Sequence, residues 1–181
     1  MNRTPSTARL LLRKLSIDDV DAFSALAGER AVADTMISIP HPLTRDAALA
    51  WLAAHTGDPE RYRSLAVCLS ATGDLIGYAG IVDIDREHCL GELSFWIGRP
   101  FRGAGYAVEA GRAAIGVAFG ELGLNRLQAF HMLRNPASGR VLERLGFRRE
   151  GVLRQRVRKW NTFEDVAAYG LLRSDTAVAA S

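Results

Sequence analysis

The sequence predicts an α/β fold of the mixed α+β kind, in which an antiparallel meander precedes a parallel crossover and helices cover both faces of one sheet. Three strand-like runs between residues 64 and 97 are separated only by short polar turns, which favours antiparallel neighbours. A helical pattern then separates the third run from a strand at 126–132, an order that gives a parallel, right-handed crossover. At 181 residues, the chain suits a single domain.

Two helices are expected before the meander. A strand is predicted at 8–15 and a helix at 16–27, which begins with a capping box of Ser16 and Asp19. A proline-rich break follows, and a second, amphipathic helix is predicted at 44–57 because a threonine caps its start and a glycine ends it.

The third strand of the meander has two chemically different faces. Alternation along a strand puts every second side chain on the same face. The two sets are Glu92, Ser94 and Trp96 against Leu93, Phe95 and Ile97. The first face is therefore polar where the strand begins.

Glycine and proline mark the boundaries of the C-terminal half. The elements expected there are a helix at 105–122, a strand at 126–132, a helix at 136–145 that Asn135 caps, and hairpin strands at 147–155 and 163–172. We predict one domain over residues 1–173 and a loose tail at 174–181.

Composition excludes several classes of protein. The net charge is only +3, and no apolar run approaches the roughly 18 residues that span a membrane. We expect a cytoplasmic protein that binds neither membrane nor nucleic acid directly, and a homodimer is left open. The four histidines and two cysteines lack metal-ligand spacing, so no metal is predicted. Cys68 and Cys89 are expected to be small buried residues.

A glycine-containing segment, Arg102-Gly103-Ala104-Gly105-Tyr106-Ala107, joins a strand to a helix. Free N–H groups in a first helical turn attract anions, and glycines let a phosphate approach the backbone. A dinucleotide fingerprint would need a glycine in place of Val108, and a Walker loop would need Gly-Lys-Ser/Thr. We therefore predict a pyrophosphate-binding loop of the acyl-CoA type.

The chain resembles the GNAT superfamily of N-acetyltransferases, and within it the RimJ/RimL-like proteins that include acetyltransferases of ribosomal-protein N-termini. The resemblance spans about residues 8–172. It rests on Gly91-Glu-Leu-Ser-Phe-Trp-Ile97, on Pro100-Phe-Arg-Gly-Ala-Gly-Tyr-Ala-Val-Glu-Ala110, and on Asn135-Pro-Ala-Ser138 followed by Leu145-Gly-Phe147. It implies a GNAT-like fold and an acyltransferase that uses acetyl-CoA as co-substrate.

The resemblance also implies cofactor-binding residues. The loop of residues 102–107 would bind the pyrophosphate, the backbone of Phe95, Trp96 and Ile97 would pair with the pantetheine arm, and Asn135 would lie near the same arm. Arg140, a turn beyond Asn135, is a further candidate for the phosphates. One departure is Pro100, which stands where the family usually has Gln or Arg.

The catalytic acid departs from the family pattern. Many members carry a tyrosine where this chain has Leu142, and in RimL-like members a serine at the position of Ser138 is a proposed substitute. Serine is also common in a first helical turn for local hydrogen-bonding reasons. Glu92 is the candidate base, and Asp83 and His131 are the alternatives. Glu92 could also be an exposed strand residue with no role in catalysis.

The mechanism expected is direct attack of a neutral amine on the thioester. Deprotonating an α-amine at pH 7 costs about 1 kcal/mol, against about 4.6 kcal/mol for a lysine. An N-terminal substrate therefore tolerates a weak base, and the resemblance implies a protein N-terminal α-amine as acceptor, such as that of a ribosomal protein. The alternatives are a small amine (a polyamine or an aminoglycoside) and a non-catalytic acyl-CoA-binding module.

A basic stretch at 140–160 holds eight Arg or Lys residues against two Glu. It is either a solvated face or a surface that attracts an anion. In the second case Arg154, Arg156 and Arg158, which alternate along one strand, would face an acidic substrate or a ribosome surface.

Overall fold

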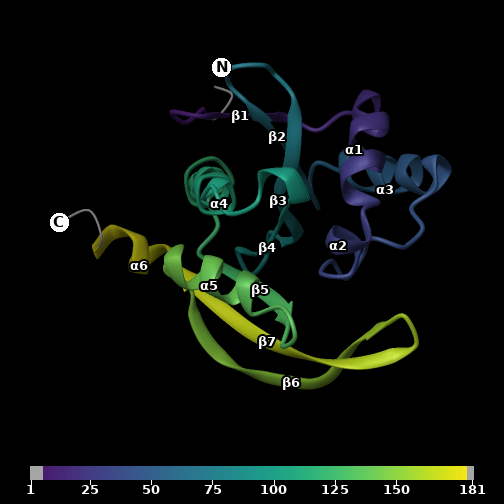
Figure 1. Ribbon diagram of the computed structural model, residues 1–181. Helices are drawn as coiled ribbons and strands as arrows, with labels where there is room; N and C mark the ends of the chain where they lie inside the picture. Colours follow the sequence, from purple (N-terminus) through teal and green to yellow (C-terminus); the bar gives the residue numbers. More distant parts are fainter. Residues whose placement is uncertain (1–5, 179–181) are drawn as a thin grey trace.

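The chain folds into one mixed seven-stranded sheet with helices on both faces (Figure 1). The computed structural model describes residues 6–178. The strand order is β1-β2-β3-β4-β5-β7-β6. The strands are β1 (Leu10–Lys14), β2 (Arg63–Leu69), β3 (Leu75–Asp85), β4 (Leu90–Ile97), β5 (Arg126–Met132), β6 (Arg148–Lys159) and β7 (Thr162–Leu172). The helices are α1 (Val20–Ala27), α2 (Arg30–Ala33), α3 (Arg45–Gly57), α4 (Tyr106–Gly116), α5 (Pro136–Arg144) and α6 (Arg173–Val178).

The sheet has an open seam at its centre. Every pair of neighbouring strands is antiparallel except β4 and β5, which are parallel. These two strands pair only where Leu90–Glu92 lies beside Arg126–Gln128. Beyond that point they separate, although β4 continues to Ile97 and β5 to Met132. The predicted meander and parallel crossover are confirmed, and the seam lies where they meet.

Two hydrophobic layers bury the two faces of the sheet. On one face, the rings of Phe23 in α1 and Trp51 in α3 stack with centroids 4.8 Å apart, and Trp96 of β4 meets Phe23 edge-on at 5.6 Å. Aromatic pairs favour both arrangements. On the other face, α4 and α5 cover Leu93 and Ile97 of β4. The alternation predicted for β4 is therefore confirmed.

The predicted helix starts are present in the structure. Ser16 Oγ accepts a hydrogen bond from the Asp18 N–H, and Asp19 Oδ2 accepts one from the Ser16 N–H, which completes the capping box. Thr44 Oγ1 accepts from the Ala47 N–H at the start of α3. These side chains satisfy N–H groups that a helix leaves without internal partners.

Three helical features differ from the prediction. The single turn α2 showed no helical signal in the sequence, and the helix expected to reach residue 122 widens into a π-helical turn at Val117–Glu121. The tail expected to be loose begins as α6, because Asp175 accepts from the Leu172 N–H and pairs with Arg148. Residues 179–181 lie outside the described part of the chain. No helix within residues 6–178 is long and apolar enough to cross a membrane.

The two cysteines differ in burial. Cys68 is buried in β2 as predicted, but the prediction for Cys89 is wrong, because that residue is exposed. It lies in the turn before β4 with a φ of +50°, so the strand begins one residue later than expected. In the described part of the chain, no three His, Cys, Asp or Glu side chains gather as a metal site requires.

Candidate active site

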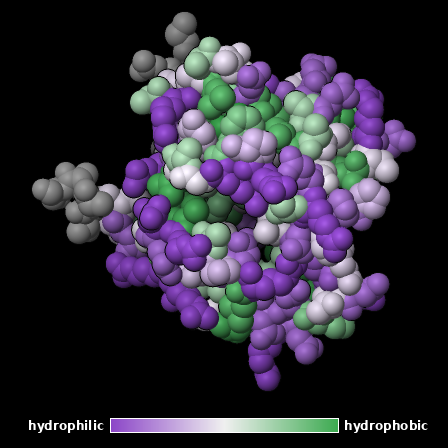
Figure 2. Space-filling model, viewed as in Figure 1, coloured by the Kyte–Doolittle hydropathy of each residue, from purple (hydrophilic) through white to green (hydrophobic). Residues whose placement is uncertain are grey.

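A cavity of about 670 Å³ occupies the seam between β4 and β5. Its α4 end is lined by residues 101–103 and 105–108 and by the start of α5, and its α3 end by α3, Asp83 of β3 and the α2–α3 connection at residues 35–38. Figure 2 shows a hollow in the face of the molecule that is turned toward the viewer, with hydrophobic and hydrophilic residues around it. The cavity thus passes through the sheet and opens toward helices on both faces.

The loop from Arg102 to Ala107 carries a row of free backbone donors. Gly103 and Gly105 have φ of +85° and +83°, left-handed conformations that glycine adopts without strain. Within the described residues, the N–H groups of 103–107 donate to no backbone carbonyl. Gly105 is the N-cap of α4, so these donors point from the positive end of a helix. The arrangement fits a pyrophosphate.

The open edge of β4 extends about 17 Å from Glu92 to Ile97. Beyond Glu92 its backbone has no partner on β5, while β3 pairs with its other edge. Phe95, Trp96 and Ile97 all line the cavity. The Arg102 guanidinium donates to the carbonyl of Ile97 at 3.0 Å, which holds the loop against the end of the strand. An extended ligand arm therefore finds backbone groups along one wall.

Arg9 supports the loop from a distant part of the sequence. Its guanidinium donates to the Ala104 carbonyl at 3.0 Å, pairs with Glu109 of α4, and lies 4.7 Å from the ring centroid of Tyr106. Partial burial opposes ionisation of Glu109, but hydrogen bonds from Thr7 and Arg9 lower its pKa. Arg9 was not predicted, since it stands 95 residues before Ala104 and nothing near it in the sequence indicates this contact.

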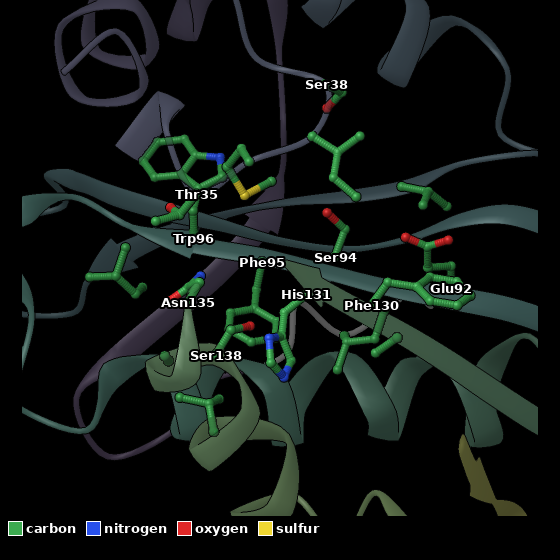
Figure 3. A pocket seen from close by; sticks show the side chains of 18 of the residues that line it. Thr35, Ser38, Glu92, Ser94, Phe95, Trp96, Phe130, His131, Asn135 and Ser138 are labelled. Atoms are coloured by element: carbon green, nitrogen blue, oxygen red, sulfur yellow. The ribbon is translucent and has the colours of Figure 1, made fainter. Parts of the chain in front are cut away.

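The start of α5 turns two polar side chains into the cavity. Asn135 is the N-cap residue, but its side chain makes no capping hydrogen bond, so the predicted capping by its side chain is wrong. The following residue is Pro136, which has no N–H, and Asn135 itself has φ −111° and ψ 67°. Asn135 and Ser138 line the cavity, and Figure 3 shows them near Phe95 and His131. Leu142 is fully buried.

One predicted cofactor residue of α5 is not at the cavity. Ala137, Val141 and Arg144 line it, as expected for positions three or four residues apart on a helix. Arg140 lies off this stripe and is exposed. Ala104, between the two loop glycines, is also exposed and does not line the cavity. The helical period of α5 would have indicated Arg144 instead of Arg140.

Glu92 lies at the point where β4 and β5 separate. It is half-buried, and Figure 3 shows its carboxyl group on the same side of β4 as Ser94. Burial raises the pKa of Glu92 to about 7; Asp83 adds to the shift and Arg156 opposes it. A carboxyl group with this pKa gains and loses a proton at neutral pH, as a general base must.

The two alternative bases also line the cavity, but each is held differently. Asp83 is paired with Arg61 at 2.8 Å. The Nδ1–H of His131 donates to the Met132 carbonyl at 2.9 Å, and its buried Nε2 has no partner. That Nε2 faces α5, where a Cβ at Gly139 would lie only 2.8 Å away. Within residues 6–178, Glu92 makes no such side-chain bond and is the least constrained of the three.

The contacts that hold the α3 end of the cavity together were not predicted. Lys159 of β6 is buried and donates to the carbonyls of Met36 at 2.6 Å and Ile39 at 2.7 Å. Arg134 pairs with Asp34 at 2.8 Å. These contacts fix the α2–α3 connection over the seam. They join segments about 100 residues or more apart, so no local pattern indicates them.

Comparisons with known proteins agree with this geometry. Residues 9–148 match the family model described as an acetyltransferase (GNAT) domain. The "Uncharacterized N-acetyltransferase p20" of Bacillus licheniformis is 28% identical over 181 residues, with 94% of this chain and 97% of that protein covered. The "Putative ribosomal N-acetyltransferase YdaF" of Bacillus subtilis is 33% identical over 103 residues, 57% of this chain and 56% of that protein.

A solved structure of similar fold holds a cofactor. The spermidine N-acetyltransferase from Vibrio cholerae, in complex with CoA and spermine, has a TM-score of 0.83 at 23% identity and covers 94% of this chain and 99% of that one. Here a split sheet, a loop of free N–H groups and a family match over most of the chain coincide. The chain therefore belongs to the GNAT family and is an acetyl-CoA-dependent N-acetyltransferase.

Proposed function

We propose that this enzyme acetylates the α-amine at the N-terminus of a protein, as RimJ/RimL-like acetyltransferases do. The observation that carries the proposal is Glu92, half-buried at the seam, with its pKa raised to about 7. An α-amine has a pKa of about 7.7–8.0, so such a base takes its proton at little cost. Deprotonating a lysine side-chain amine, whose pKa is about 10.4, would cost about 4 to 5 kcal/mol at pH 7.

The binding of the co-substrate follows from the α4 end of the cavity. The N–H groups of residues 103–107 bind the pyrophosphate, and the open edge of β4 at Phe95–Ile97 pairs with the pantetheine arm. Asn135, whose amide has no capping role, hydrogen-bonds the same arm. In this proposal Arg144, which lines the cavity, meets a phosphate instead of the exposed Arg140. Acetyl-CoA supplies the acetyl group as a thioester.

Each proton has a defined place in the reaction. The neutral amine attacks the carbonyl carbon of the thioester, so a C–N bond forms and the C–S bond breaks. Glu92 takes the proton that the amine nitrogen loses, directly or through water. The Ser138 hydroxyl donates a hydrogen bond to the departing sulfur. Neither cysteine lines the cavity, which supports direct transfer without an acyl-enzyme.

The comparisons leave the acceptor open, since one relative is named for ribosomal acetylation and one structure for spermidine. The likeness to the spermidine enzyme, at 23% identity, concerns the fold. A small amine such as a polyamine or an aminoglycoside is therefore the second candidate. The non-catalytic acyl-CoA-binding module is the third.

The test is release of free CoA thiol with four kinds of acceptor: peptides with a free N-terminus, the same peptides N-blocked but carrying a lysine, spermidine, and an aminoglycoside. We expect turnover of the free peptides, acetylation at the α-amine by mass spectrometry, and no reaction of the blocked peptides. Reaction of the small amines alone contradicts the proposal. Tight acetyl-CoA binding with no product from any acceptor supports the binding module.

A further inference from the structure

An irregularity in β6 brings Arg156 to the cavity. The pairing of β6 with β7 shifts between Leu153 and Val157. In the middle of this bulge, Gln155 has a φ of +50° and its N–H donates to Asp165 Oδ1 at 2.9 Å. Bulges of this kind re-aim a side chain and occur often beside active sites. Arg156 lines the cavity as a result.

The bulge also separates the arginines that the sequence placed on one strand face. Arg158 donates to Asn161, Lys159 donates to two backbone carbonyls, and Arg154 is exposed and does not line the cavity. Arg156 makes no hydrogen bond or ion pair with any residue between 6 and 178. Of the three alternating arginines, it is the one that faces the reaction site and still has all its donors.

The charges at the α3 end suit an anionic acceptor better than a polycation. Asp83 already has a cationic partner, Arg61, at 2.8 Å. Glu92 loses its negative charge when it accepts the proton of the amine. The Arg156 charge is then left without a compensating carboxylate, and it repels a polyamine and attracts an anion.

We propose that Arg156 binds a carboxylate carried close to the acceptor amine, so that the enzyme prefers acidic acceptors. The carboxylate belongs to an Asp or Glu at the first or second position of a peptide, or to a free amino acid. A guanidinium binds a carboxylate through two parallel hydrogen bonds, which fixes both distance and orientation. This inference rests on the proposed function, with Glu92 as base.

The test compares kcat/KM for peptides that differ only by Asp or Asn at the first or second position. The enzymes are wild type, Arg156→Gln, Arg156→Lys and the control Arg154→Gln. Rates are measured at about pH 8.5, above the pKa of about 7 that Glu92 has in the wild-type enzyme. We expect wild type to favour Asp over Asn by about tenfold or more, the size of one charge-assisted interaction.

The variants separate recognition from a structural role. Arg156→Gln should bring the Asp-to-Asn ratio to about one, Arg156→Lys should restore part of it, and Arg154→Gln should keep the wild-type ratio. A ratio near one in wild type, or an unchanged ratio in Arg156→Gln, overturns the inference.

Further arms distinguish this inference from the proposed function. Equal acetylation of Asp and Asn peptides defeats the inference and leaves N-terminal acetylation standing. Reaction of free aspartate over free asparagine, with no peptide acetylated, supports recognition by Arg156 and contradicts the N-terminal function. Turnover of spermidine with no peptide or amino acid acetylated overturns both.

Discussion

The two ends of the cavity present different kinds of chemical group to a ligand. The α4 end consists mainly of one continuous segment, residues 102–107, and its free donors are backbone N–H groups. The α3 end is assembled from side chains of several elements, among them Asp83, Glu92 and Arg156. Backbone recognition depends on local conformation and tolerates many side chains. Side-chain recognition depends on long-range packing and can change while the fold stays the same. Backbone recognition therefore suits a co-substrate that a whole family shares, and side-chain recognition suits acceptors that differ between members.

The largest effect should come from a charge placed on the backbone site. Gly103→Glu puts a carboxylate against the proposed pyrophosphate position. Repulsion between these two negative groups should weaken acetyl-CoA binding by about 100-fold or more. The fold should survive, because nothing lies within 4 Å of a Cβ at this glycine. Its positive φ adds a strain of about 1 to 2 kcal/mol. Titration calorimetry measures the affinity.

A matched control exists at Gly73, which lies in the turn between β2 and β3. It has a φ of +79° and equally open surroundings, but it does not line the cavity. Gly73→Glu therefore carries the same backbone strain and should leave acetyl-CoA affinity at the wild-type value. Equal affinity of the Gly103→Glu and wild-type enzymes would remove the pyrophosphate assignment.

The next effect tests the base at the α3 end. Glu92→Gln should lower kcat/KM by about 100-fold. Because burial raises the pKa of Glu92 to about 7, protonation of Glu92 should steepen the fall of the wild-type kcat/KM below that pH. The variant should keep only the shallower limb that comes from protonation of the acceptor amine itself, at about pH 7.7–8.0. The measurement is a pH profile of kcat/KM.

Asp83→Asn is the matched carboxylate variant for this profile. Asp83 raises the pKa of Glu92, so its removal should move the acid limb to lower pH without abolishing it. If Asp83→Asn shows only the limb of the acceptor amine and Glu92→Gln keeps the wild-type profile, Asp83 is the base.

A smaller effect is expected at Ser138. A thiol with a pKa of about 8.5 can leave without a dedicated acid, so Ser138→Ala should lower kcat by only about tenfold. KM for acetyl-CoA should not change, since the hydroxyl acts on the departing sulfur. Ser94→Ala, a cavity residue on the other side of β4, is the comparison. A kcat equal to wild type in Ser138→Ala would assign this serine to local structure.

The smallest effect is expected at Arg9, which supports the loop through Ala104 and Glu109. Arg9→Ala should raise KM for acetyl-CoA by about fivefold and leave kcat unchanged, because the loop donors are only less well ordered. Initial-rate kinetics measure both constants. Arg45→Ala, which removes an exposed ion pair with Asp21 far from the cavity, should change neither. A lower kcat with an unchanged KM in Arg9→Ala would contradict this role.

Much of the fold could be predicted from local signals. The capping box at Ser16, the threonine cap at Thr44, and the positive-φ Gly123 and Gly146 beside α4 and α5 each mark a boundary near the observed one. The glycine loop was likewise visible, because its conformation depends on residues next to each other in the chain. Glu92 and Ser138 could be named as candidates from alternation and family pattern.

The rest depends on contacts between distant segments. Arg9 meets Ala104 across 95 residues, and Lys159 meets Met36 across 123. The bulge at Gln155 interrupts an alternation that looked regular, so the sequence placed three arginines together where the structure separates them. Such long-range pairings have no local pattern, and residues that line the α3 end were missed for this reason.

The seam between β4 and β5 ties the ligand to the stability of the protein. Backbone groups on the open edge of β4 have no strand beside them beyond Glu92. In the proposed binding mode, a pantetheine arm on this edge takes the place of the missing strand, so the folded state should gain stability by mass action, about 2.7 kcal/mol when the ligand is at 100 times its Kd. Slow amide exchange in β4 would then report that the site is occupied, and the co-substrate would form part of the sheet that binds it.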